Sequence, residues 1–155
     1  MRLIIIFIFP FVCYAQTLSG KAVSITDGDT FKLLTKDSTL VRIRLANIDC
    51  PERKQPFSAK AKQFTSDAIL GKHIKLNVLK QDRYGRLIAY VFYDTKNLSK
   101  ELLKAGLAWH YVRYSDDDLL QTLEDGAKKD KRGLWIEPNA IAPWEWRSNK
   151  KKKSK

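Results

Sequence analysis

A chain of 155 residues has room for a single domain, and its hydrophobic content of 44% is enough for one core. The 29 lysines and arginines outnumber the 17 acidic residues and give a formal charge of +12. This excess favours a polyanionic partner such as nucleic acid, with an acidic membrane surface as the second candidate. The sequence contains no evident internal repeat and no second domain.

The first 15 residues have the pattern of an export signal. Arg2 provides a short positive region, residues 3–12 are apolar but too few to span a bilayer comfortably, and Ala15 completes a cleavage pattern. We expect cleavage after Ala15, which would give a mature, secreted or periplasmic protein beginning at Gln16 with no stable membrane association. The alternatives are a retained anchor or a lipoprotein modified at Cys13.

Cysteine usage allows few structural roles. Once Cys13 is removed with the signal, Cys50 has no partner in the chain, so an internal disulfide is excluded. A catalytic thiol formed by Cys50 with His73 or His110 rests on residue type alone. A role for the backbone of Cys50 is favoured.

The first half of the mature chain is predicted to form β-structure. The expected strands cover residues 18–26, 29–35, 41–45, 73–80 and 86–93. Asp27-Gly28 is typical of a hairpin turn between the first two. In the third, apolar residues alternate with Arg42 and Arg44, which directs Arg44 away from the core. Five short strands of this kind suggest a small closed barrel.

Three helices are expected between and after the strands. The first covers residues 58–70, where apolar residues recur at helical spacing, and the second covers about 98–105. The third begins at the acidic run 116–118 and ends in the basic run before Gly133. Acidic residues at the start and basic residues at the end complement the helix dipole.

A tail follows the domain, which we place at residues 16–137. Residues 138–155 contain prolines and Trp144 and Trp146, and together with Trp135 they suggest an extended segment lying over the domain. The lysines at 150–153 are expected to be disordered. The tryptophans offer rings on which bases stack, but covering a small core is the favoured interpretation.

Two short motifs carry the chemistry. Asp27-Gly28-Asp29-Thr30 and Asp49-Cys50-Pro51-Glu52 supply carboxylates, and Arg44 supplies a guanidinium between them in sequence. Cleavage of a phosphodiester needs oxygen ligands for a divalent cation, a base for water, and cations for the developing negative charge. Each part has a candidate here.

These motifs, with Asp82-Arg83-Tyr84-Gly85-Arg86 and the stretch 131–135, resemble the thermonuclease family, the staphylococcal nuclease-like domains. The four motifs occur in the family's order, and the resemblance covers about residues 17–136. It implies an α+β fold, an OB-type five-stranded β-barrel with three α-helices. It also implies a calcium-dependent phosphodiesterase that cuts DNA and RNA.

The resemblance also assigns metal ligands. Asp29 and Asp49 match the calcium-binding carboxylates, and Cys50 takes the position whose backbone carbonyl completes the protein ligands. Calcium prefers oxygen donors, so a thiol would be the wrong ligand. Taken alone, Asp29 reads as an ordinary turn residue, and the matching Asp49 favours the metal interpretation.

The reacting groups are assigned in the same way. Glu52 matches the general base, although a glutamate after proline is also common near helix starts. Arg44 and Arg86 match the two arginines that hold the phosphate, because a guanidinium fork grips two phosphate oxygens at once. On their own, both arginines would read as solvated strand residues.

The resemblance extends to substrate contacts. Arg83 and Tyr84 match positions that contact a terminal phosphate, and Tyr114 matches one of two tyrosines beside the base. The second tyrosine falls on Val112 without a gap and on Tyr111 after a shift.

The sequence therefore predicts a monomeric, exported, calcium-dependent endonuclease that acts on DNA and RNA with little sequence preference. The alternative is a non-catalytic OB-type nucleic-acid-binding module, and a membrane-surface protein is a third class. Retention of the five candidate site residues favours the enzyme: Asp29, Arg44, Asp49, Glu52 and Arg86. Sequence does not choose between DNA and RNA as the physiological substrate, between periplasm and medium, or between biological roles.

Overall fold

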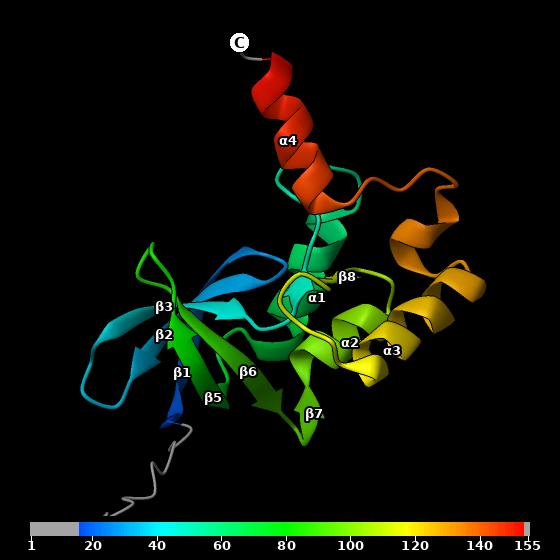
Figure 1. Ribbon diagram of the computed structural model, residues 1–155. Helices are drawn as coiled ribbons and strands as arrows, with labels where there is room; N and C mark the ends of the chain where they lie inside the picture. The colour runs from blue at the N-terminus through cyan, green and yellow to red at the C-terminus, as the bar shows by residue number, and fades with distance from the viewer. Residues whose placement is uncertain (1–15, 154–155) are drawn as a thin grey trace, which may run out of the picture.

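The computed structural model describes residues 16–153 (Figure 1). The predicted signal peptide at residues 1–15 lies outside this range and is neither supported nor contradicted. Within the described chain, no helix is long and apolar enough to cross a membrane.

A closed five-stranded barrel forms the body of the molecule, as predicted. Its strands run in the order β3-β2-β1-β5-β6, and a parallel pairing of β3 with β6 closes the ring. The strands are β1 Gln16–Asp27, β2 Thr30–Thr35, β3 Leu40–Leu45, β5 His73–Gln81 and β6 Leu87–Tyr93. The short β7, Lys96–Asn97, extends the sheet beyond β6.

Alternation of apolar and polar residues determines which side chains fill the barrel. In β3, Ile43 and Leu45 are buried, whereas Arg42 is exposed and Arg44 lies partly buried between the core and solvent. The β2–β3 ladder pairs Thr30 with Arg44. This register brings Arg44 beside the β1–β2 turn, and therefore beside Asp29.

Three helices form at the predicted places: α1 Ser58–Ile69, α2 Leu98–Lys104 and α3 Asp118–Lys129. α1 and α2 pack on the barrel, and α3 packs on α2. Asn97 caps α2 by accepting a hydrogen bond from the backbone of Lys100. Asp117 caps α3 by accepting from Leu119 and Leu120. These caps satisfy amide groups that the helices themselves leave without partners, which explains why the acidic run begins α3.

Two short elements connect α2 and α3 to the rest of the fold. β8, Trp109–His110, pairs with β4, Ile48–Asp49, and the 3-10 helix η1 covers Gly133–Ile136. Gly133 has a φ of +57°, and a Cβ there would collide with the carbonyl of Gly106. Only glycine permits this close crossing of the chain.

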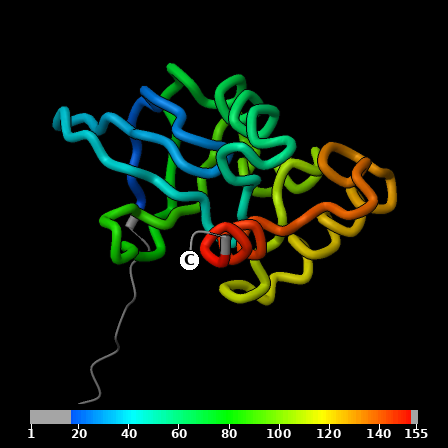
Figure 2. The backbone as a smooth tube through the Cα atoms, turned by 90° about the horizontal axis from the view of Figure 1, so that it is seen from above, coloured from blue at the N-terminus to red at the C-terminus, as the bar shows by residue number. Residues whose placement is uncertain are grey.

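A fourth helix, α4 (Pro143–Lys153), replaces the extended and disordered tail predicted from the sequence. Its residues show no apolar stripe, so periodicity gave no helical signal. In Figure 1 the lower end of α4 lies beside the loop that precedes α1, and Figure 2 shows the helix end-on. Trp135 and Trp144 pack against a small cluster around Trp109, as the structural interpretation of the tail predicted.

Candidate active site

The β1–β2 turn places Asp29 in the interior, where it is 1% exposed. The hydroxyl of Thr65 on α1 donates a hydrogen bond of 2.6 Å to the carbonyl of Gly28. A Cβ at Gly28 would meet the side chains of Cys50 and Ala61. The close approach of α1 therefore requires glycine in the turn and fixes the backbone that carries Asp29.

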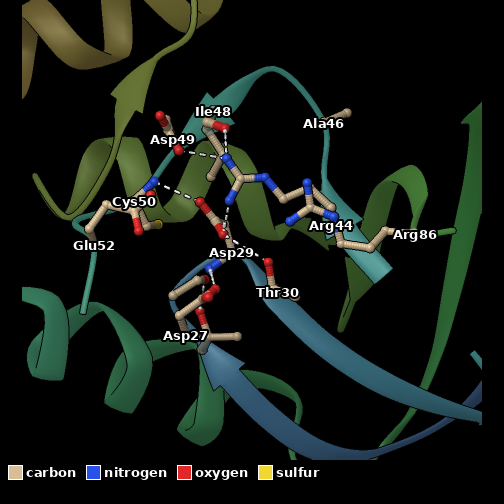
Figure 3. Close-up of polar contacts among 12 residues, drawn as sticks. Asp27, Asp29, Thr30, Arg44, Ala46, Ile48, Asp49, Cys50, Glu52 and Arg86 are labelled. Carbon is tan, nitrogen blue, oxygen red and sulfur yellow. Dashed lines mark hydrogen bonds and ion pairs between the residues drawn. The ribbon is translucent and has the colours of Figure 1, made fainter. Parts of the chain in front are cut away.

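Arg44 joins this turn to β4 (Figure 3). One amino group of its guanidinium pairs with Asp29, and the other lies 2.6 Å from Oδ1 of Asp49. The backbone N–H of Cys50 donates to Oδ2 of Asp29 at 2.7 Å. The structure thus brings together the two predicted metal-binding carboxylates and the first predicted phosphate-binding arginine.

Burial governs the electrostatics of these groups. It raises the pKa of Asp29 to about 6, although the neighbouring Arg44 acts in the opposite direction. For Arg44, burial disfavours the charge, but Asp29 and Asp49 outweigh it and raise the pKa above its usual value. Asp49 is 0% exposed. Two buried carboxylates therefore share the permanently charged guanidinium of Arg44.

Cys50 contributes through its backbone in this arrangement. Burial, reinforced by the charge of Asp29, raises the pKa of the Cys50 thiol well above its usual value, so the sulfur stays protonated. Among the described residues, no hydrogen bond joins this thiol to His73 or His110, and His73 is exposed on β5. The catalytic-thiol alternative gains no support from the geometry.

Glu52 lies at the edge of the same cluster. Its backbone N–H donates to Oε1 of Gln55 at 2.9 Å, and its half-exposed carboxylate accepts a hydrogen bond from Arg147. A second amino group of Arg147 lies 2.9 Å from Oδ2 of Asp49. Arg147 therefore links the predicted general base to a predicted metal ligand.

Sequence reasoning missed Arg147. The residue belongs to α4, beyond the last motif, and it reaches Glu52 and Asp49 across 95 and 98 residues of chain. No local pattern marks it among the many basic residues of the tail. Its position was accessible only from the docking of α4.

Arg86 lies on the same side of the barrel as Arg44, because β3 and β6 are parallel and Arg44 is paired with Ile88. Its guanidinium is held by Asp82, at 2.8 Å from both Nε and Nη2. Burial opposes the charge of Asp82, but hydrogen bonds from Arg86 and Tyr84 lower its pKa overall. The structure thus places Arg86 near the site but pairs it with its own hairpin.

Arg83 and Tyr84 form the tip of the β5–β6 hairpin. Arg83 donates to the Tyr84 hydroxyl at 2.7 Å, and the Arg86 guanidinium lies 5.6 Å from the centre of the same ring. Both Arg83 and Tyr84 are exposed. The hairpin therefore gathers two cations around one solvent-facing phenol, apart from the buried carboxylates.

Tyr114 stands in the loop before α3. Its ring meets Tyr111 edge-on, with centroids 4.8 Å apart, and Tyr111 stacks on Trp144 at 5.1 Å. Val112 is 64% exposed. Of the two candidates for the second tyrosine position, the geometry therefore pairs Tyr111 with Tyr114.

Few side chains in the site could bind a metal ion. Within residues 16–153, no group of three or more histidine, cysteine, aspartate or glutamate side chains is placed to hold a metal. Asp29 and Asp49 are two carboxylates joined by Arg44. A cation held by them would need backbone or water oxygens to complete its coordination.

Comparison with known proteins identifies the family. The sequence profile described as "Staphylococcal nuclease homologue" matches residues 42–137, more than half of the chain. The chain belongs to the staphylococcal nuclease family. Arg44, Asp49, Glu52 and Arg86 all lie inside the matched segment, whereas Arg147 lies beyond it.

Several relatives agree over most of the chain. An "uncharacterized endonuclease" of Haemophilus influenzae is 37% identical over 96% of this chain and 84% of its own length. An "uncharacterized endonuclease" of Escherichia coli is 34% identical, covering 95% of this chain and 96% of its own. A "micrococcal nuclease" of Shigella flexneri is 34% identical over 83% of this chain and 79% of its own.

Proposed function

We propose that this protein is a calcium-dependent endonuclease that hydrolyses phosphodiester bonds of DNA and RNA with little sequence preference. Family membership and relatives named as endonucleases support the reaction class. The observation that carries the proposal is the convergence of Asp29, Asp49 and Arg44 beside the half-exposed Glu52. This combination provides oxygen donors, a base and a phosphate-binding cation in one place.

The residues present suit calcium. Asp29 and Asp49 offer carboxylate oxygens, and the protonated thiol of Cys50 leaves its backbone carbonyl as the donor that the family resemblance implies. Three carboxylates, including Glu52, face the two guanidiniums of Arg44 and Arg147, and the carboxylate of Asp27 lies beside Asp29, so the cluster carries an excess of negative charge. A bound calcium ion would offset that excess and supply Lewis-acid charge at the phosphate.

The remaining chemistry belongs to the side chains. Glu52 is exposed enough to meet water and takes its proton as the water oxygen attacks phosphorus. As that bond forms, the bond from phosphorus to the departing oxygen breaks. Arg44 and Arg86 meet the negative charge that grows on the phosphoryl oxygens, and Arg86 must turn from Asp82 to do so.

The decisive experiment compares wild type, Glu52→Gln and the matched surface variant Glu137→Gln on single-stranded DNA and RNA. With calcium, we expect Glu52→Gln to lower turnover by about a hundredfold or more, whereas Glu137→Gln leaves it unchanged. Chelation should abolish cleavage by wild type. Binding should persist in Glu52→Gln, because the basic surface provides most of the affinity.

Each result separates two hypotheses. Binding by folded wild-type protein without calcium-stimulated cleavage would favour the non-catalytic OB-type module. Full activity of Glu52→Gln would keep the reaction class and reject Glu52 as the base. Activity in excess chelator would reject the metal requirement. Export as a monomer to the periplasm or medium is part of the same proposal.

A further inference from the structure

Helix α4 carries residues whose chemistry the catalytic site does not use. Arg147 anchors the N-terminal part of the helix to Asp49 and Glu52, so the residues next to Arg147 lie near the proposed reacting centre, while the helix continues away from the barrel (Figure 1). Trp146 and Lys150, four residues apart, share a face of the helix. The contacts of Arg147 therefore fix where Trp146 and Lys150 lie relative to Asp49 and Glu52.

That face borders a shallow pocket of about 260 Å³. It is lined by Arg53, Lys54, Trp146, Asn149 and Lys150. Three of these five are cations and none is acidic. In the part of the chain that the structure describes, Arg53, Lys54 and Lys150 form no ion pair. The pocket therefore combines uncompensated positive charge with an indole ring.

We propose that this pocket is a nucleotide subsite that binds the substrate strand beyond the scissile phosphodiester. A cationic groove with an aromatic platform is the chemistry by which proteins hold single-stranded nucleic acid without reading its sequence. Trp146 stacks on a base, while Arg53, Lys54 and Lys150 contact phosphates. Arg53 directly follows Glu52 in the chain, and Trp146 directly precedes Arg147, which binds Glu52, so two linings of the pocket are neighbours of residues at the proposed reacting centre.

The subsite rests on the proposed nuclease function, and its test uses two substrates. The first is a short single-stranded oligonucleotide, bound in calcium by protein carrying Glu52→Gln so that cleavage is suppressed. The second is a nitrophenyl phosphodiester of thymidine, which has no nucleotide beyond the scissile bond. Only the oligonucleotide reaches the pocket.

Replacing Arg53, Lys54 and Lys150 together by glutamine should weaken oligonucleotide binding about tenfold or more. The salt dependence should also fall, by about two in the slope of log affinity against log salt. The matched control replaces the exposed Lys36, Lys96 and Lys129 by glutamine, removing the same charge elsewhere. Hydrolysis of the small diester should be equal in both triple variants. Equal salt slopes in both would overturn the subsite.

Trp146→Ala tests the stacking role. We expect about a tenfold loss of affinity for the oligonucleotide, no loss for an abasic strand of equal length, and recovery in Trp146→Phe. Equal losses on both strands would mean that the substitution only displaces α4, and would reject the platform. Failure of wild type to hydrolyse either substrate would reject the nuclease function instead, since oligonucleotide binding is measured separately.

A membrane surface is the competing partner for the same cations. Vesicles containing phosphatidylglycerol provide the comparison. The subsite predicts that the Arg53, Lys54 and Lys150 substitutions affect oligonucleotide binding far more than vesicle binding. A loss confined to vesicles would assign this face to lipid and overturn the proposal.

Discussion

At the scale of single residues, Asp29 carries a charge that burial disfavours and that Arg44 only partly compensates. Its carboxylate is enclosed by the β1–β2 turn, α1 and β4, and the nearest compensation is a guanidinium that Asp49 also uses. A buried charge with a shared partner is less stable than a solvated one. Burial therefore disfavours the charged form of the carboxylate that a cation would need.

This unfavourable burial predicts a pH dependence in metal-free protein. The pKa of Asp29 is raised from 3.8 to about 6, so between these values the folded state keeps a proton that the unfolded state has lost. The free energy of unfolding should fall as pH rises through this window and level off above it. Relative to Asp29→Asn, the loss should be about 3 kcal/mol, because each unit of pKa difference between the folded and unfolded states corresponds to about 1.4 kcal/mol. Urea unfolding of both proteins in chelator would measure it. A constant difference across this pH range would contradict the prediction.

At this scale the sequence pointed to three residues that the structure brings together, Asp29, Arg44 and Asp49. Alternation in β3 correctly oriented Arg44, and the two carboxylate motifs are joined by it as their chemistry suggested. The assigned roles of Glu52, Arg86 and the substrate-contacting residues stay predictions. Arg147 could not be found from the sequence, because its contacts depend on how a distant helix docks.

At the scale of the elements, the β5–β6 hairpin keeps Arg86 paired with Asp82. Asp82 accepts backbone hydrogen bonds from Tyr84 at 2.9 Å and from Arg86 at 3.0 Å, in addition to the guanidinium. One carboxylate therefore sets both the turn and the direction of Arg86. The hairpin resembles a local capping arrangement more than a catalytic one.

Asp82→Ala should separate these two roles. Without its carboxylate, the turn loses the backbone hydrogen bonds from Tyr84 and Arg86 that order it. We expect this loss to outweigh the release of the Arg86 guanidinium from its ion pair, and kcat/KM on single-stranded DNA to fall about tenfold. Stability should fall by only about 1 kcal/mol, because the hairpin lies largely at the surface. Steady-state kinetics and thermal unfolding provide the two measurements. Unchanged kinetics in a folded variant would show that Asp82 does not position Arg86.

The helices show where sequence patterns succeed and fail. The helix α3 was predictable because an acidic cap, an apolar face and a basic end agree. In contrast, α4 begins with proline and continues through polar residues, so its stability comes from docking. Trp144 on Tyr111 and Arg147 on Asp49 provide that docking. Contacts between residues so far apart in sequence leave no local signature.

At the scale of the whole molecule, barrel topology was predictable because five alternating strands have few ways to close. The extent of the mature protein is a separate question. Arg2, the apolar run and Ala15 predict removal of residues 1–15 on export. Intact mass measurement of the secreted protein should give a chain beginning at Gln16. A retained Met1, or a lipid on Cys13, would show that the signal interpretation is wrong.

The parallel pairing of β3 with β6 also affects the rate at which the barrel folds. The hairpins β1–β2 and β5–β6 join neighbouring segments, but the closing ladder pairs residues 43–45 with residues 87–89. Contacts between such distant segments form slowly, because the chain between them must first be restrained. Arg44 lies in β3, one of the two strands of that ladder, and Arg86 directly precedes β6, the other strand. We therefore expect the closing ladder to be the slowest part of the barrel to form, and the arrangement that brings Arg44 and Arg86 to one side of the barrel to form only together with it.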